Sequence, residues 1–386
     1  SGVVPNLGVE AVSPALVPTS AVAFTRTRTG KRKRLGEGAF GIVYEGTFAG
    51  TPVAIKVMKP PPGGCSVSNV RAFLREGVTH FRFRHALILP LHGLYVDPLT
   101  EPPEFGMVMP LCRHSDVLTA VFGKGTPGDV VSTVPPPRRL RWLWQMAVAL
   151  AHMHALGTVH TDVKPDNALL DEDDNALLCD FGMAHFRPDW AAAARSTASA
   201  TGSITGKAQG SPAYMCPKLL LDEAGALVTP ASDVYSLAIV GYELGSGRKA
   251  YQHGAVFTGG TTLWSYLARG GRPATAAELA ALEPRGLGDL LRDMWATEPA
   301  SRPTMAEVVR RLEPLMAAAG VELTCSHPDA TREVLAARRE ASAAMEARDE
   351  AHSLLAAAEA RNARLADELD GARAAFAATI AAKDAV

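Results

Sequence analysis

The sequence is poor in cysteine, and none of its cysteines is spaced as a metal ligand would be. Its 386 residues include five cysteines, at positions 65, 112, 179, 216 and 325. No two of them form a C-x-x-C pair, and an odd, scattered set is typical of reduced thiols in an intracellular protein.

An excess of charge is also missing. The 39 basic and 40 acidic side chains give a formal net charge of −1. No overall positive field therefore recruits nucleic-acid phosphates, and we expect no nucleic-acid partner. A dense basic run does occur at 26–34, with six cations in nine residues. It is interpreted either as a nuclear signal or, slightly better, as a solvated strand face.

Long apolar runs are absent. No stretch reaches the ~18 consecutive apolar residues of a membrane span, so we expect no span. Pro5, Pro14 and Pro18 interrupt the apolar N-terminal segment, and no basic region precedes it. This pattern argues against a secretory signal and favours a cytoplasmic location.

What remains is a chain with 47% hydrophobic residues, enough for one large or two modest domains. Residues 1–29 show no sustained period, which predicts a flexible lead-in. Residues 30–120 have mainly strand patterns. Residues 121–320 have mainly helical patterns, including a buried helix that should stop at Gly157.

The C-terminal range 329–386 contains no proline and is rich in Ala, Glu and Arg, so we expect one long helix. A shallow heptad pattern suggests a coiled coil that would self-associate. A solvated helical tail is the alternative. The pattern consists of Leu355, Ala358, Leu365, Leu369, Ala372 and Phe376.

A glycine cluster, "GEGAFGIV" at 36–43, lies between two strand patterns. A dinucleotide fingerprint would instead lie between a strand and a helix. A glycine hairpin can fold over a polyphosphate because backbone N–H groups approach it closely. Val43 would then contact a base. An ordinary glycine turn is the alternative.

A lysine, Lys56, ends the next strand pattern, "VAIK". It would hold phosphate oxygens as a point charge if it lay at a nucleotide site, and would otherwise be a solvated edge residue. Such a lysine needs a carboxylate to fix its position. Glu76, on a predicted helix, is the candidate, although it also fits an exposed helix face.

Polar side chains gather in "HTDVKPDNALLDEDDNALLCDFG". Asp162, Lys164 and Asn167 share one short turn, and Asp180 follows thirteen residues after the asparagine. Each aspartate alone would suit a turn. The hairpin-like stretch between them returns the chain to the same place, so we expect the four side chains to converge.

In order and spacing, these motifs resemble a protein kinase over roughly residues 33–315. The resemblance implies an α+β, bilobal fold, with a β-rich N-lobe at 30–111, a helical C-lobe at 112–316 and the helical extension behind it. "DVKPDN" and "GSPAYM" are similar to serine/threonine kinases. "SDVYSLAIVGYELGSGRKAY" and "RHALILPLHG" resemble the tyrosine-kinase-like branch. Ser211 matches the segment-end residue that contacts Asp162 and Lys164 in that family.

The resemblance implies that this chain transfers the γ-phosphate of ATP to protein hydroxyls. Asp162 would be the catalytic base, Lys164 would neutralise the γ-phosphate, and Asn167 and Asp180 would hold Mg²⁺. A scaffold that binds nucleotide or partners without catalysis is the alternative. The ATP site would comprise Leu35, Gly36, Gly38, Gly41, Val43, Ala54, Lys56, Glu76, Met109, Pro110, Cys112, Asp116, Leu169 and Asp180.

Two departures from the family affect the activation segment, the stretch that follows "DFG" and ends near Lys218. Thr161 replaces an arginine that often grips a phosphate there, so we expect phosphorylation of this segment to matter less. Lys218 replaces a glutamate that pairs with the position of Arg302. Two cations ~4 Å apart would repel by about 4 kcal/mol at an intermediate dielectric. We expect the two side chains to splay into solvent or to be bridged by another acid, for which Asp222 and Glu223 are candidates.

The third departure is His80, four residues after Glu76, at a position where the family buries an aliphatic side chain. Two interpretations are open. A satisfied core histidine is favoured, and a pH-sensitive helix position is the alternative.

Overall fold

The computed structural model describes residues 16–38, 41–59, 67–124, 131–187, 210–221, 228–251 and 262–321. The expected coiled coil at 329–386 and residues Asp222 and Glu223 lie outside these ranges. Within them, no helix has the length and apolar character that crossing a membrane would require.

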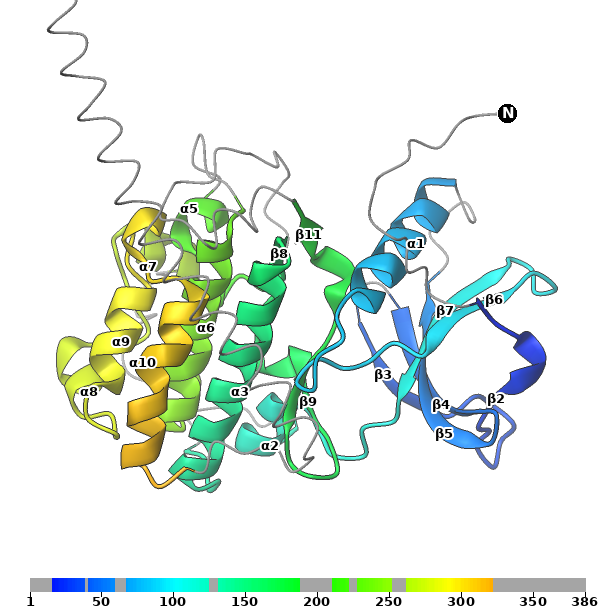
Figure 1. The fold of residues 1–386 in the computed structure, drawn as a ribbon, viewed down its shortest axis with the longest axis horizontal. Helices are drawn as coiled ribbons and strands as arrows, with labels where there is room; N and C mark the ends of the chain where they lie inside the picture. The colour runs from blue at the N-terminus through cyan, green and yellow to red at the C-terminus, as the bar shows by residue number, and fades with distance from the viewer. Residues whose placement is uncertain are drawn as a thin grey trace, which may run out of the picture. The chain divides into compact units, whose positions relative to one another are not determined.

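The N-lobe is built on one sheet whose strand order is β1-β6-β7-β5-β4-β2, with β3 paired to β4 (Figure 1). Only β1 and β6 pair in parallel. The strands are β1 (Leu16–Val17), β2 (Val22–Phe24), β3 (Arg34–Glu37), β4 (Gly41–Phe48), β5 (Thr51–Met58), β6 (Gly93–Asp97) and β7 (Glu104–Pro110).

Alternation along β5 divides this sheet into two faces. Val53, Ile55 and Val57 are buried on one face, where they pack with Tyr95 and Val108. The other residues of the strand, including Ala54 and Lys56, therefore point to the opposite face. That face is covered by helix α1 (Val67–Phe81).

Contact between α1 and the sheet is close. A Cβ atom at Gly77 would lie 2.6 Å from Cδ2 of Leu94 on β6, so only glycine lets the helix approach so near. Phe73, one turn earlier, is also buried against Leu94. The sheet thus holds the helix that carries Glu76.

The sheet begins earlier than the expected boundary at residue 30. Residues 16–17 pair with β6, and 22–24 pair with β4. Phe24 packs edge-to-face against Tyr44 and Tyr95, with ring centroids 5.8 Å apart in both cases. The expectation of a lead-in through residue 29 is therefore corrected for 16–29. These strands are too short to show a period, and Pro18 separates them.

Two cations of the basic run at 26–34 pair with acids on strands of the sheet. Arg32 makes a bidentate pair with Glu104, and Lys33 pairs with Glu45 at 2.7 Å. These contacts support the strand-face interpretation of the run.

The C-lobe is mainly helical. Its helices are α2 (Val117–Phe122), α3 (Pro136–Ala155), α5 (Pro217–Leu220), α6 (Pro230–Ser246), α7 (Leu263–Ala268), α8 (Ala276–Ala280), α9 (Leu287–Met294) and α10 (Met305–Ala318). Two short strand pairs accompany them: β8 (Thr158–Val159) with β11 (His185–Phe186), and β9 (Ala168–Leu170) with β10 (Ala176–Leu178). Two 3-10 turns, η2 (Pro165–Asn167) and η3 (Phe181–Met183), follow β8 and β10 along the chain.

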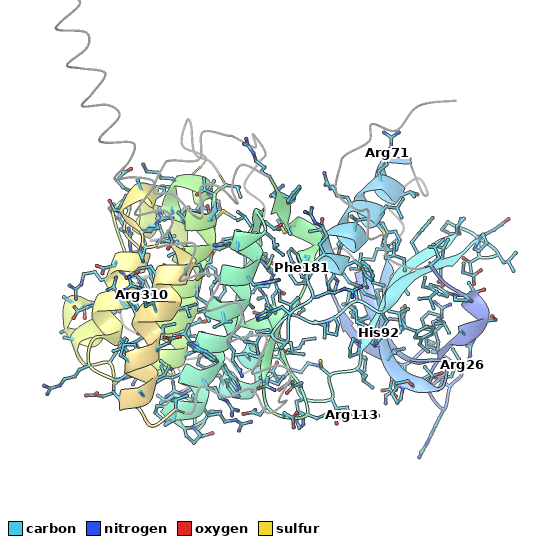
Figure 2. All side chains as sticks on the ribbon, viewed as in Figure 1. Arg26, Arg71, His92, Arg113, Phe181 and Arg310 are labelled. Carbon is cyan, nitrogen blue, oxygen red and sulfur yellow. The ribbon has the colours of Figure 1, made fainter. Side chains whose placement is uncertain are left out.

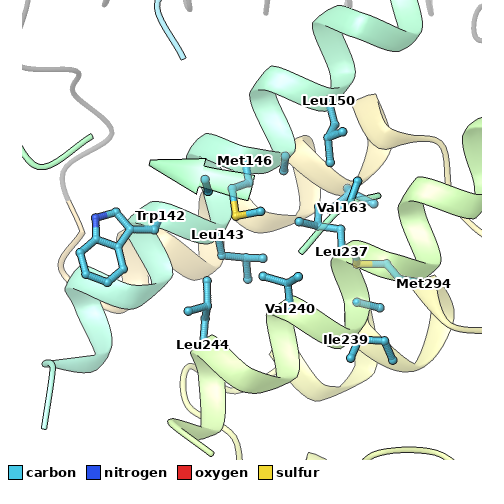
Figure 3. Close-up of a cluster of buried hydrophobic side chains, with 14 of the residues drawn as sticks. Trp142, Leu143, Met146, Leu150, Val163, Leu237, Ile239, Val240, Leu244 and Met294 are labelled. Atoms are coloured by element: carbon cyan, nitrogen blue, oxygen red, sulfur yellow. The ribbon is translucent and has the colours of Figure 1, made fainter. Parts of the chain in front are cut away.

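Helices α3 and α6 form the centre of this lobe. Leu143 and Met146 of α3 pack with Leu237, Val240 and Leu244 of α6, and all five are almost fully buried (Figure 3). Helix α3 ends as expected, because Gly157 adopts the left-handed conformation with φ 74°.

The membership of β1 in the sheet can be tested with Val17→Asp. Val17 is 5% exposed within the apolar cluster behind β5. An unpaired carboxylate there should cost roughly 2–5 kcal/mol and lower the melting temperature by roughly 4–10 °C. Ala23→Asp, at an exposed position of β2, is the matched control and should change it little. Equal effects of the two substitutions would contradict the assignment.

Candidate active site

Lys56 is held between two carboxylates. Its Nζ atom donates to Oε1 of Glu76 at 2.9 Å and to Oδ1 of Asp180 at 2.6 Å. Glu76 comes from α1, and Asp180 immediately precedes η3 in the C-lobe. The structure thus confirms the expected Lys56–Glu76 pair and joins both lobes through one ammonium group.

The electrostatics of this triad keep Lys56 and Asp180 charged. Burial disfavours the charged form of Lys56, but Glu76 and Asp180 outweigh it and raise the pKa of Lys56. Burial also opposes ionisation of Asp180, but the Lys56 ammonium outweighs it and lowers the pKa of that carboxyl. The site therefore presents a fixed cation beside a fixed anion at neutral pH.

Asp162, Lys164 and Asn167 converge on the turn between β8 and η2. Oδ2 of Asp162 accepts from Nζ of Lys164 at 2.6 Å and from Nδ2 of Asn167 at 3.1 Å. Burial raises the pKa of Asp162, but hydrogen bonding and the charge of Lys164 outweigh it, so the pKa is lowered. Asp162 is 8% exposed and remains a carboxylate.

This turn is shaped by Asp233, a residue that sequence reasoning missed. Asp233 lies in the first turn of α6 and is fully buried. Its carboxylate accepts from the backbone N–H groups of His160 and Thr161, both at 2.8 Å, and contacts Nε2 of His154 at 2.8 Å. An acid inside an otherwise apolar helix pattern was the available signal.

Thr161 adopts a conformation that needs such support. Its φ is 70°, a left-handed value that costs a β-branched residue of order 1–3 kcal/mol. Besides the bond to Asp233, its Oγ1 donates to the carbonyl oxygen of Met183 at 2.6 Å. Thr161 thus ties the turn to η3.

The hairpin of β9 and β10 returns the chain to this turn, as the thirteen-residue spacing predicts. Leu169 is opposite Leu177, and the N–H of Cys179 donates to the carbonyl oxygen of Asn167 at 2.9 Å. Asp180 follows directly. Asn167 and Asp180 are therefore neighbours across the hairpin.

Phe181 packs against rings from both lobes. Figure 2 shows Phe181 between the two lobes. Its ring centroid lies 4.7 Å from that of His80, 5.3 Å from that of Phe83 and 5.4 Å from that of His160. The imidazole of His80 makes a 2.6 Å hydrogen bond with the carbonyl oxygen of Leu89. Burial lowers the pKa of His80 to about 4, so it is neutral near pH 7. His80 is thus a satisfied core histidine.

Strand register gathers the expected base-binding residues on the α1 side of the sheet. Val43 lies opposite Lys56, and Ala54 lies opposite Met109. Leu169 and Cys112 pack against the cluster that contains Met109. Pro110, the last residue of β7, pairs with Val53, and Leu35 lies in a bulge between Arg34 and Gly36. Val53 is buried on the face away from α1, so Pro110 does not share the face of Ala54 and Met109. Contact of these residues with a base stays a prediction.

The protein's own packing requires glycine at only one of three positions in the β3–β4 hairpin, Gly41. A Cβ at Gly41 would lie 2.7 Å from the carbonyl oxygen of Val57, so the neighbouring strand demands glycine there. At Gly36 and Gly38 a Cβ would meet no atom within 4 Å, and neither has a left-handed φ. The protein itself does not require glycine at these two positions, but close approach of a polyphosphate would.

Asp116 has a local role that was not expected. Its Oδ1 accepts from the N–H of Thr119 at 2.7 Å and its Oδ2 from the Thr119 hydroxyl at 2.9 Å. Asp116 therefore caps α2. A contact from Asp116 to ATP stays a prediction.

The segment 210–221 is docked onto the catalytic turn. The N–H of Ser211 donates to Oδ1 of Asp162, and Nζ of Lys164 donates to the Ser211 hydroxyl, both at 2.9 Å. Further along, the Tyr214 hydroxyl donates to the buried carboxylate of Glu243 at 3.0 Å. The expected double contact of Ser211 is confirmed.

Lys218 and Arg302 do not share an acid. Lys218 pairs with Glu298 at 2.8 Å, a partner that sequence reasoning missed. Arg302 is buried and donates to the backbone carbonyl oxygens of Ala231, Ala296 and Thr297. The two cations are thus separated onto different acceptors. The expectation that both side chains splay into solvent was wrong, because Arg302 is buried and Lys218 is paired.

A metal ion would find only part of its coordination shell in the protein. No group of three or more His, Cys, Asp or Glu side chains suited to a metal occurs in the described part of the chain. Asn167 and Asp180 offer two oxygen-bearing side chains. That set fits a hard cation such as Mg²⁺, which is typically held by one or two carboxylates together with phosphate oxygens.

Comparison with known proteins gives a consistent result. A family model described as a protein kinase domain matches residues 30–312. The salt tolerance receptor-like cytoplasmic kinase 1 of Oryza sativa subsp. japonica is 31% identical over 294 residues, which cover 72% of this chain and 74% of that relative.

Two further relatives are longer than this chain. A probable serine/threonine-protein kinase of Dictyostelium discoideum is 30% identical over 285 residues, covering 72% of this chain and 27% of the relative. The serine/threonine-protein kinase CTR1 of Arabidopsis thaliana is 25% identical over 294 residues, covering 75% and 32%. The chain therefore spans about a third or less of these two proteins.

Glu243 predicts a pH dependence of stability. Burial raises its pKa to about 7, despite hydrogen bonds from the Ala250 N–H and the Tyr214 hydroxyl. The stability linked to this group is therefore fully present below the ordinary pKa of 4.5 and is lost as pH rises through 7. Glu243→Gln should reduce the loss between pH 5 and 8 by roughly 1–3 kcal/mol.

Melting temperatures of both proteins across that pH range measure this effect. Glu283→Gln, at an exposed position, is the control and should leave the wild-type pH dependence intact. Equal pH dependence in wild type and Glu243→Gln would contradict the assignment.

The Lys218–Glu298 pair predicts a reversible change in segment 210–221. Exposed ion pairs are worth about 0.2–1 kcal/mol, so Lys218→Glu should speed amide hydrogen exchange there by only about two- to fivefold. Adding Glu298→Lys should restore the rate, because it reverses the pair. Arg292→Glu, in an exposed pair on α9, should have no effect. A double variant as fast as the single one would refute the anchoring role.

Proposed function

Because this chain belongs to the protein kinase domain family, we propose that it is an ATP-dependent kinase of protein serine and threonine hydroxyls. The observation that carries the proposal is the convergence of Lys56, Glu76 and Asp180 beside the turn of Asp162. The serine/threonine preference is supported by the contact of Lys164 with Ser211. It is also supported by two of the relatives, which are named as serine/threonine-protein kinases.

ATP with a divalent ion, for which we propose Mg²⁺, supplies the transferable phosphoryl group and part of its charge neutralisation. Asn167 and Asp180 would hold the ion through their side-chain oxygens. Lys56 would place its ammonium against phosphate oxygens, and Lys164 would add a second cation near the transferred group. These residues bind and orient, which is most of what phosphoryl transfer needs.

Asp162 would receive the substrate hydroxyl. Its lowered pKa keeps it ionised, so it can only accept a hydrogen bond. Such a weak base is suited to orienting the hydroxyl and taking its proton late, as a loose transition state requires. Lys164 and the Ser211 N–H hold the carboxylate in one orientation while it does so.

The scaffold alternative receives no support from the described residues, because Lys56, Glu76, Asp162, Asn167 and Asp180 are all present. Lys56 contacts Glu76 and Asp180, and Asn167 contacts Asp162. A cytoplasmic location and self-association through 329–386 remain proposals. The basic run at 26–34 favours a strand face over a nuclear signal. Two of its cations, Arg32 and Lys33, pair with acids of the sheet.

Asp162→Asn tests the proposed activity. Loss of proton handling should lower the phosphotransfer rate to a generic basic protein by about 10²–10⁴, while ATP binding persists because Lys56 and Asp180 are unchanged. Radiolabel transfer and equilibrium nucleotide binding measure the two properties separately. Asp289→Asn, on the exposed face of α9, is the matched control. Equally poor transfer by wild type and Asp162→Asn, with both binding ATP, would favour the scaffold.

A further inference from the structure

Helix α1 carries two large apolar side chains on its exposed side. Leu74 is 42% exposed and Val78 is 41% exposed. Their four-residue spacing puts them on one face of the helix. Another side of the helix contacts the sheet, because Glu76 forms an ion pair with Lys56 on β5.

These side chains point toward the β1 edge of the sheet. Strands β5, β7, β6 and β1 follow one another in that order, and Gly77 rests on Leu94 of β6. Successive helix residues are about 100° apart. Since Glu76 faces β5 on one side of Gly77, Leu74 and Val78 project on the other side, toward β1.

Leu16 adds a third exposed apolar side chain at this edge. It is 68% exposed and its register partner is Leu94. Val17, the next residue, is buried on the far face of the sheet, so Leu16 points to the face covered by α1. We define Leu16, Leu74 and Val78 as the outer α1 surface.

We propose that residues 1–15 of this chain dock on the outer α1 surface. Residues 1–15 are followed directly by Leu16, which belongs to this surface. The segment is therefore attached to the described chain next to the place where it would dock. Its apolar side chains are Val3, Val4, Leu7, Val9 and Val12. Fully extended it could reach about 50 Å, whereas the 15 residues of α1 span about 22 Å.

Charge also favours this occupant. Residues 1–15 contain one charged side chain, Glu10. Arg71, labelled on α1 in Figure 2, and Arg75 are exposed, and helical spacing puts both beside Leu74 and Val78. A tethered segment acts at an effective concentration of about millimolar. A separate partner or a second copy at micromolar concentration would have to displace it.

Docking would bear on catalysis through Glu76. A segment that covers Leu74 and Val78 holds α1 against the sheet and so favours the Lys56–Glu76 contact. This consequence rests on the proposed kinase function, whereas the docking itself does not.

Amide hydrogen exchange on the full chain tests the docking without ATP or substrate. In wild type, amides within residues 3–12 should exchange at least tenfold more slowly than in an unstructured peptide of the same sequence. Leu74→Glu/Val78→Glu should abolish this protection, and so should Leu7→Glu/Val9→Glu. Leu99→Glu, at a side chain 92% exposed on the β6–β7 turn, is the control and should preserve it. Equal melting temperatures would confirm that every variant is folded.

Three results would overturn the proposal. The first is peptide-like exchange of residues 3–12 in wild type. The second is equal protection in Leu74→Glu/Val78→Glu and Leu99→Glu. The third is protection that grows with protein concentration, which would assign the surface to a second copy. A failed phosphotransfer assay leaves each of these measurements unaffected, so the two proposals fail separately.

Discussion

The ammonium group of Lys56 lies 2.9 Å from Glu76 and 2.6 Å from Asp180, and the geometry of the site depends on this contact. The three groups come from β5, α1 and the start of η3, which are far apart in the chain. The buried ammonium needs both acids, because desolvation alone would favour the neutral amine. The same requirement fixes α1 on the sheet and brings Asp180 to the phosphate-binding face.

The C-lobe supports the other half of the chemistry by a different means. Asp233, fully buried in α6, accepts the backbone N–H groups of His160 and Thr161 and so fixes the turn that carries Asp162. Burying this carboxylate costs desolvation free energy, which its contacts with His154, His160 and Thr161 offset. A rigid central helix thus positions Asp162, while the segment at Ser211 limits how its carboxylate turns.

Much of this site was predictable from local pattern. The hairpin spacing predicted the return of Asp180 to Asn167. The position of Lys56 at the end of a strand pattern, with Glu76 on the following helix, predicted their pair. Contacts between distant segments were not predictable. The apolar pattern around Asp233 marks that acid as unusual, but only the fold supplies its partners, and the same holds for the partner of Glu298. The strand at Leu16 was missed because two residues show no period and pairing with β6 alone defines them.

The central claim is that two lysines and three polar side chains, Asp162, Asn167 and Asp180, converge on one triphosphate. Affinity labelling of lysine tests it most directly. An ATP analogue with an acyl group on its terminal phosphate acylates a lysine that lies against that phosphate. The account predicts that Lys56 and Lys164 are the principal acylated residues, and that excess ATP with Mg²⁺ suppresses both. Labelling scattered over surface lysines, unchanged by ATP, would contradict it.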